Sequence, residues 1–157
     1  MKIDGDTLEA MAVDPSTDKM YVNNPAKNEV IVLNRKTRSV LASWPVKLGK
    51  HNVALALNDA GYRLFVASRT GDISIFDTST GKELSSFPIG KGVDDLAFDS
   101  TSKRLYAPCG GDGLTYVYEQ RVTLSSSRGQ RSLRRPSLRQ VWAFPSATIT
   151  GTEIWML

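Results

Sequence analysis

The chain of 157 residues is 41% hydrophobic and 23% charged, the composition of a globular protein that can bury a core. No apolar stretch is long enough for a membrane helix, and a single cysteine, Cys109, and a single histidine, His51, exclude a disulfide framework and a multi-histidine metal site. The net charge of +4 belongs to the C-terminal part alone: residues 1–120 carry 14 Lys and Arg against 15 Asp and Glu, whereas residues 121–157 carry six Arg and one acid, Glu153.

A sequence unit of about 40 residues occurs three times in the first 120 residues. Each copy has an apolar run ending in an acidic or amide turn residue, and an aromatic residue seven positions later. The turn residues and aromatics are Asp14 and Tyr21, Asn58 and Phe65, and Asp99 and Tyr106. The copies are spaced by 44 and then 41 residues, which is typical of propeller repeats with one four-stranded blade per copy. We expect the repeats at about 8–50, 51–91 and 92–120.

The second copy shows the expected strands most clearly. In chain order they are expected at 53–57, 63–68, 73–77 and 83–87, separated by turns rich in Asn, Asp, Thr, Ser and Gly. The run 53–57 is apolar throughout, which indicates a strand covered on both faces, as an inner strand between neighbouring blades is. The predicted fold is therefore all-β, with β-propeller blades of four antiparallel strands, two complete and a third partial.

The turn after the third strand of each copy needs a residue with positive φ to close the hairpin. Gly81 occupies this place in the second copy, and glycine adopts positive φ without strain. Arg38 occupies it in the first copy. If Arg38 keeps the same conformation, it costs on the order of 1 kcal/mol relative to glycine.

Several segments of the first 120 residues resemble the YVTN family of β-propeller repeat proteins and its bacterial YncE-like branch. They are Arg63–Ala67, Ile73–Lys82, Val93–Asp99, Lys103–Tyr106, Gly110–Gly113 and Val117–Gln120. The resemblance covers about residues 5–120 and implies a parent propeller of six to eight blades that is usually exported. This chain holds fewer than three complete blades and its N-terminus has no secretory signal, so we expect it to be cytoplasmic as it stands.

The segment 121–157 breaks the repeat and is rich in Ser and Arg. A fourth copy would place a turn residue near 141 and an aromatic near 148, and neither is present. Three explanations stay open: a shifted reading frame, a disordered basic linker, or an arm that binds nucleic acid or phospholipid through its arginines. Because no aromatics alternate with the basic residues of 121–140, nucleic acid is the least favoured partner. We expect 121–150 not to dock as a blade.

Within the propeller resemblance, three residues are candidates for the mouth of the central channel, where propellers often bind ligands. His51 lies where the chain enters an inner strand, and Asp94 and Asp95 are expected at the equivalent place in the third copy. His51 is either a ligand-binding side chain or a loop histidine with a local hydrogen bond. The two aspartates either help to bind a cation or divide into one solvated carboxylate and one turn cap.

Two other features have structural explanations. Gly110–Gly113 lies between two expected strands with no helix after it, so it is a hairpin turn rather than a phosphate-binding loop. Cys109 has no histidine or basic residue beside it in the sequence to activate the thiol, which favours a buried structural cysteine.

The sequence therefore favours a binding or scaffold module for an unidentified protein or small molecule, without a cofactor, metal or catalytic residue of its own. The alternative is a contribution to a propeller enzyme, such as a lactonase or a quinoprotein-like oxidoreductase, whose other site residues would come from further blades. Uncovered blade faces at the two ends are expected to promote self-association.

Overall fold

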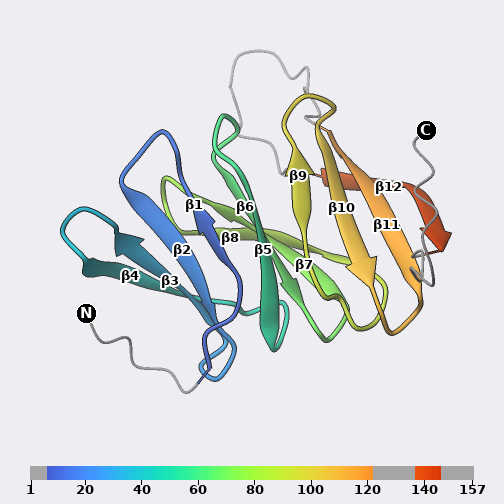
Figure 1. Cartoon of the computed structure of the whole chain (residues 1–157), viewed down its shortest axis with the longest axis horizontal. Helices are drawn as coiled ribbons and strands as arrows, with labels where there is room; N and C mark the ends of the chain where they lie inside the picture. The colour runs from blue at the N-terminus through green and yellow to red at the C-terminus, as the bar shows by residue number, and fades with distance from the viewer. Residues whose placement is uncertain (1–6, 122–136, 146–157) are drawn as a thin grey trace, which may run out of the picture.

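The computed structural model describes residues 7–121 and 137–145, which form three four-stranded antiparallel sheets (Figure 1). Blade 1 consists of β1 (Met11–Val13), β2 (Lys19–Asn24), β3 (Glu29–Asn34) and β4 (Ser39–Pro45). Blade 2 consists of β5 (Asn52–Asn58), β6 (Arg63–Ser68), β7 (Asp72–Asp77) and β8 (Glu83–Pro88). Blade 3 consists of β9 (Ala97–Asp99), β10 (Arg104–Cys109), β11 (Leu114–Arg121) and β12 (Ser137–Pro145). The all-β prediction is confirmed, and no helix long and apolar enough to cross a membrane occurs in these residues.

The strands of each blade pair in the order of the sequence, and the three blades share one register. The second and third strands place the same pairs opposite each other: Met20 with Leu33, Leu64 with Phe76, and Leu105 with Tyr118. Each outer strand also carries a β-bulge at the same height, where one aliphatic residue has no partner on the third strand. These bulged residues are Leu41, Leu84 and Val141. Residues of different blades can therefore be compared position by position.

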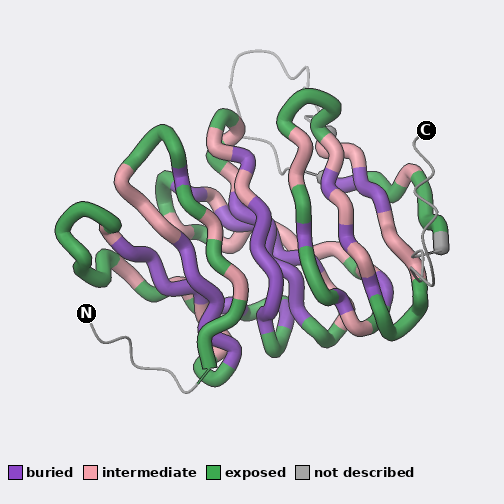
Figure 2. Tube along the Cα trace, viewed as in Figure 1, coloured by how far each residue is buried: buried purple, intermediate pink, exposed green. Residues whose placement is uncertain are grey.

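The hydrophobic core lies between the blades, because each blade packs one face on the next. We call the side of a blade that faces the preceding blade its front face and the other its back face. One buried cluster joins the back face of blade 1 to the front face of blade 2, around Tyr21, Trp44 and Phe76. A second joins the back face of blade 2 to the front face of blade 3. Blade 2, between the two, holds the most continuous run of buried strands (Figure 2).

The two turns compared in the sequence adopt the expected backbone. Gly81 has φ +73° and Arg38 has φ +55°, so both lie in the left-handed region. Gly81 has a second reason to be glycine, since a Cβ there would clash with the indole of Trp44 in blade 1. Arg38 has no described blade in front of it, and this accounts for the tolerance of a side chain at that position.

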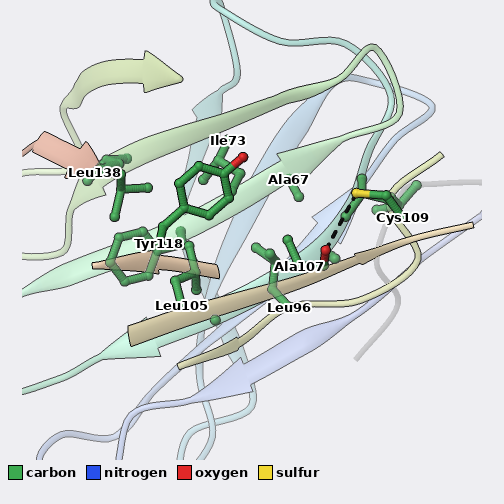
Figure 3. Close-up of a cluster of buried hydrophobic side chains, with 14 residues drawn as sticks. Ala67, Ile73, Leu96, Leu105, Ala107, Cys109, Tyr118 and Leu138 are labelled. Carbon is green, nitrogen blue, oxygen red and sulfur yellow. Dashed lines mark hydrogen bonds between the residues drawn. The ribbon is translucent and has the colours of Figure 1, made fainter. Parts of the chain in front are cut away.

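The segment 137–145 docks as the outer strand of blade 3, so our expectation that 121–150 would not join a blade is wrong for these residues. β12 pairs with β11 from Leu114 opposite Pro145 to Arg121 opposite Ser137. Leu138 is buried in the cluster shared with blade 2, on the side where Tyr118 lies (Figure 3). Residues 122–136 and 146–157 lie outside the described residues, and the explanations offered for them stay predictions.

A repeated pattern in the outer strands could have revealed β12. Val40–Pro45, Glu83–Pro88 and Gln140–Pro145 each place an aliphatic residue second, an aromatic fifth and a proline sixth. The sequence search looked near 141 for the inner strand of a fourth blade, whereas the outer strand of the third lies there. The long connection from Arg121 to Ser137 hid this, because the corresponding turns of blades 1 and 2 span only 35–38 and 78–82.

Candidate functional site

The candidate residues lie on one end of the blades, at the lower edge of Figure 1. This end, which we call the loop face, is formed by the connections 25–28, 46–51, 69–71, 89–96 and 110–113. The connections are joined to one another by hydrogen bonds between neighbouring loops. The loop face is therefore a set of short, backbone-anchored segments rather than independent loops.

His51 stands at the start of β5 with its side chain exposed and its backbone in the left-handed region, φ +60°. Its N–H donates to Oδ1 of Asn28 at 2.9 Å, and its carbonyl accepts from the N–H of Arg69 at 3.0 Å. Gly92 occupies the same position in blade 3, with φ +63° and the matching bond from Gly110 to its carbonyl at 2.8 Å. The local hydrogen bonds of His51 are thus made by its backbone, and its imidazole projects from the loop face.

Asp94 and Asp95 are both exposed, but they do not occupy the place of His51, as we expected. The bridge between Val93 and Cys109 matches the pair Asn52 and Ser68 of blade 2. In that register the two aspartates replace Val53 and Ala54, two and three positions further on. The sequence comparison missed this because the two carboxylates stay in solvent and β9 begins only at Ala97.

The aspartates hold backbone. Oδ2 of Asp94 accepts from the N–H of Gly110 at 3.1 Å, and Oδ1 of Asp95 accepts from the N–H of Leu96 at 2.7 Å. Among the described residues, no group of three or more His, Cys, Asp or Glu side chains is placed to hold a metal ion. The geometry of Asp94 is that of a side chain fixing the neighbouring loop.

Two lysines that our sequence analysis did not single out occupy equivalent loops. Lys50 and Lys91 are exposed, and each follows a buried glycine, Gly49 or Gly90. Their N–H groups are held by a side chain of the next loop, Thr70 Oγ1 at 3.1 Å for Lys50 and Asp112 Oδ2 at 2.9 Å for Lys91. The sequence signal was the Gly-Lys pair repeated at the period of 41 residues.

Cys109 lies beneath this face, fully buried, with its Sγ 3.6 Å from the carbonyl oxygen of Ala107 (Figure 3). Burial raises the pKa of the thiol to about 11, and the carboxylates of Asp112 and Asp94 act in the same direction. The thiolate is the nucleophilic form of cysteine, so this thiol is chemically inert at neutral pH. The prediction of a structural cysteine agrees with this environment.

Comparisons with known proteins place the fold. No family model and no curated protein matches the chain. It is similar to Kuenenia stuttgartiensis hydrazine synthase, with a TM-score of 0.64 and 17% identity over 76% of this chain and 36% of that chain. It is also similar to U3-55K, with a TM-score of 0.63 and 19% identity over 72% of this chain and 36% of that one. The β-propeller domain of Cps50 (Swd1) from Myceliophteria thermophila gives a TM-score of 0.61 and 12% identity over 74% and 37%.

The fold is that of a β-propeller. At these identities the similarity shows the fold alone, and the chain spans only 36–37% of the length of the propellers it matches. The propeller part of the predicted resemblance is confirmed, whereas the YVTN-type, YncE-like branch stays a prediction.

Proposed function

We propose that this chain is the binding or scaffold part of a YncE-like propeller and that its loop face holds an acidic segment of a partner. The proposal depends on one observation: Lys50, Arg69 and Lys91 are exposed on connections whose backbone is already fixed by hydrogen bonds. A surface fixed before binding loses little conformational freedom when a partner docks. Exposed cations on it attract an acidic partner over several ångströms.

The same geometry favours binding over independent catalysis. Asp94 and Asp112 each accept a backbone N–H, so these carboxylates are used to shape the loops. Asp112 also accepts from the hydroxyl of Tyr116 at 2.9 Å. Activity as part of a propeller enzyme would need further residues from blades outside this chain, and that alternative predicts turnover only in a larger protein.

The test is a titration of the chain with a fluorescent poly-glutamate peptide, followed by anisotropy at low ionic strength. We expect binding that weakens as salt is added, since exposed charges are screened beyond about 10 Å at 0.1 M salt. The double variant Lys50→Glu with Lys91→Glu should weaken binding at least tenfold. The matched control is Lys36→Glu with Lys82→Glu, which makes the same change of charge in exposed turns at the other end of the blades.

Equal losses in the two double variants would show that net charge, not the loop face, attracts the peptide, and would overturn the proposal. Failure of the unchanged chain to bind poly-glutamate would overturn it as well. Tighter binding of a single-stranded oligonucleotide than of the peptide would replace the acidic protein partner by a nucleic acid.

A further inference from the structure

The junction between two blades is built twice in this molecule from equivalent residues. At the first junction, Leu55, Leu64, Val66 and Phe76 of blade 2 are buried against blade 1. At the second, the same positions of blade 3 are buried against blade 2, namely Leu96, Leu105, Ala107 and Tyr118. A back face and a front face of this sequence repeat are therefore complementary surfaces.

The front face of blade 1 has the same apolar positions, and no described residue covers it. Met11 and Val13 replace Leu55 and Leu57, and their exposed fractions are 64% and 42%. Behind them, Val22, Ile31 and Leu33 form a buried cluster with Met20 that belongs to blade 1 alone. This surface has the composition of a junction with one half missing.

The back face of blade 3 is the other half. Tyr106 and Val117 occupy the positions of Phe65 and Ile75, which are buried at the second junction. Phe144 occupies the position of Trp44, the residue that packs on Phe76 across the first junction. Phe144 is 47% exposed and its neighbour Trp142 is 56% exposed. Large exposed aromatics of this kind mark a surface that another protein covers.

A polar contact at the rim of the junction gives the match a charge. Nδ2 of Asn58 in blade 2 donates to Oε1 of Gln120 in blade 3 at 2.7 Å. The residue at the position of Asn58 on the free back face is Asp99. The residue at the position of Gln120 on the free front face is Arg35, since both donate their N–H to the equivalent carbonyl, that of Lys103 or Asp18. The two free faces therefore present a carboxylate and a guanidinium at corresponding places.

From these observations we propose that the free front face of blade 1 docks on the free back face of blade 3 of a second copy of this chain. The contact continues the junction already formed twice within the molecule, with Arg35 of one copy paired to Asp99 of the other. It is a head-to-tail contact, because the two surfaces differ, so it produces closed rings or longer assemblies rather than a two-fold dimer.

The first experiment is sedimentation velocity of the full chain over a range of concentrations. We expect species larger than the 17.2 kDa monomer, increasing with concentration. Met11→Glu should weaken association at least tenfold, because it places a charge in the centre of the junction. The control is Leu48→Glu, an apolar residue of similar exposure, 53%, in the connection between blades 1 and 2. Circular dichroism checks that both variants remain folded.

The second experiment exchanges the charges. Arg35→Asp and Asp99→Arg should each weaken association several-fold, since each places like charges at the junction. The double variant should recover association, because it restores an opposite pair between copies. Monomers at all concentrations, equal effects of Met11→Glu and Leu48→Glu, or a double variant no better than the two single ones would each overturn the proposal. A chain that stays at 17.2 kDa would leave a further blade, not a second copy, as the partner of these faces.

Discussion

Blade 2 and its two neighbours have the same backbone with different residues at several equivalent positions. The clearest case is the inner strand: β5 runs over Asn52–Asn58, whereas β9 is formed by Ala97–Asp99 alone. At the position of Ala54, which is fully buried between two blades, blade 3 has the exposed Asp95. An inner strand thus extends as far as its residues tolerate burial on both faces, and two carboxylates are enough to shorten it. Four substitutions that convert one blade toward another test this conclusion.

The largest effect is expected from Ala54→Asp, which gives β5 the residue of blade 3. The carboxylate would enter a site with no exposed surface, so we expect the free energy of unfolding to fall by about 4 kcal/mol or more. Urea denaturation followed by circular dichroism measures it. The reverse substitution, Asp95→Ala, should change stability by less than about 0.5 kcal/mol, because that site is a solvated surface. Similar losses in the two variants would refute the burial explanation.

Gly81→Arg comes next, since it gives blade 2 the turn residue of blade 1. The new Cβ meets the Trp44 indole and also forces a non-glycine residue to φ +73°, so a loss of about 2–3 kcal/mol is expected. Thermal unfolding monitored by tryptophan fluorescence reports both the stability and the displacement of Trp44. Arg38→Gly, the matched change, should leave that fluorescence unaltered, and a shift of equal size would contradict the role assigned to Trp44.

The turn cap of blade 2 should make stability depend on pH more than the cap of blade 1. Burial acts to raise the pKa of Asp77, but hydrogen bonds from Ser79 and Thr80 outweigh it and hold this pKa below its ordinary value. Asn34 makes the same contacts in blade 1, to Lys36 and Thr37, with a neutral amide.

Because the folded pKa of Asp77 is the lower one, its stabilisation is complete at neutral pH and is lost as the pH falls below about 4. Asp77→Asn should therefore reduce the acid sensitivity of the urea midpoint between pH 5 and about 2. A residual slope is expected, since the pKa values of Asp14 and Asp99 are also lowered by their hydrogen bonds. An unchanged slope in Asp77→Asn would show that this cap does not contribute.

The smallest effects are expected at His51, whose place in blade 3 is taken by Gly92. His51→Gly relieves a left-handed residue of about 1 kcal/mol of strain but gives the unfolded chain more freedom, so stability should change little. His51→Val should lose about 1–2 kcal/mol, because a β-branched residue is least tolerant of positive φ. If valine and glycine were equally stable at this position, the measured φ would not be the reason for the backbone strain.

The repeat was visible in the sequence because its marker residues are those whose surroundings hardly vary between blades. The turn residue Asn58 and the buried aromatic Phe65, seven positions apart, recur in all three blades with only conservative changes. Their spacing was enough for the strand order, the all-β class and the positive φ of Arg38 and Gly81.

The rest depended on contacts between segments far apart in the chain. β12 was missed because a strand across a long connection is recognised only by what it pairs with, and here the pairing with β11 is non-local. The loop face was incomplete for the same reason. His51 and the two aspartates were found as unusual residue types, but their backbone partners, such as Asn28 and Gly110, come from other connections.

The strand order within each blade has a consequence for synthesis on the ribosome. Since every strand pairs with its immediate neighbour in the sequence, a blade can complete its hydrogen bonds before the next blade has left the exit tunnel. Only the back face of the newest blade then waits for a partner, so the aggregation-prone surface moves along the nascent chain one blade at a time. The longest wait falls within blade 3, whose β11 must remain an open edge until the long segment that follows it has been translated and β12 arrives.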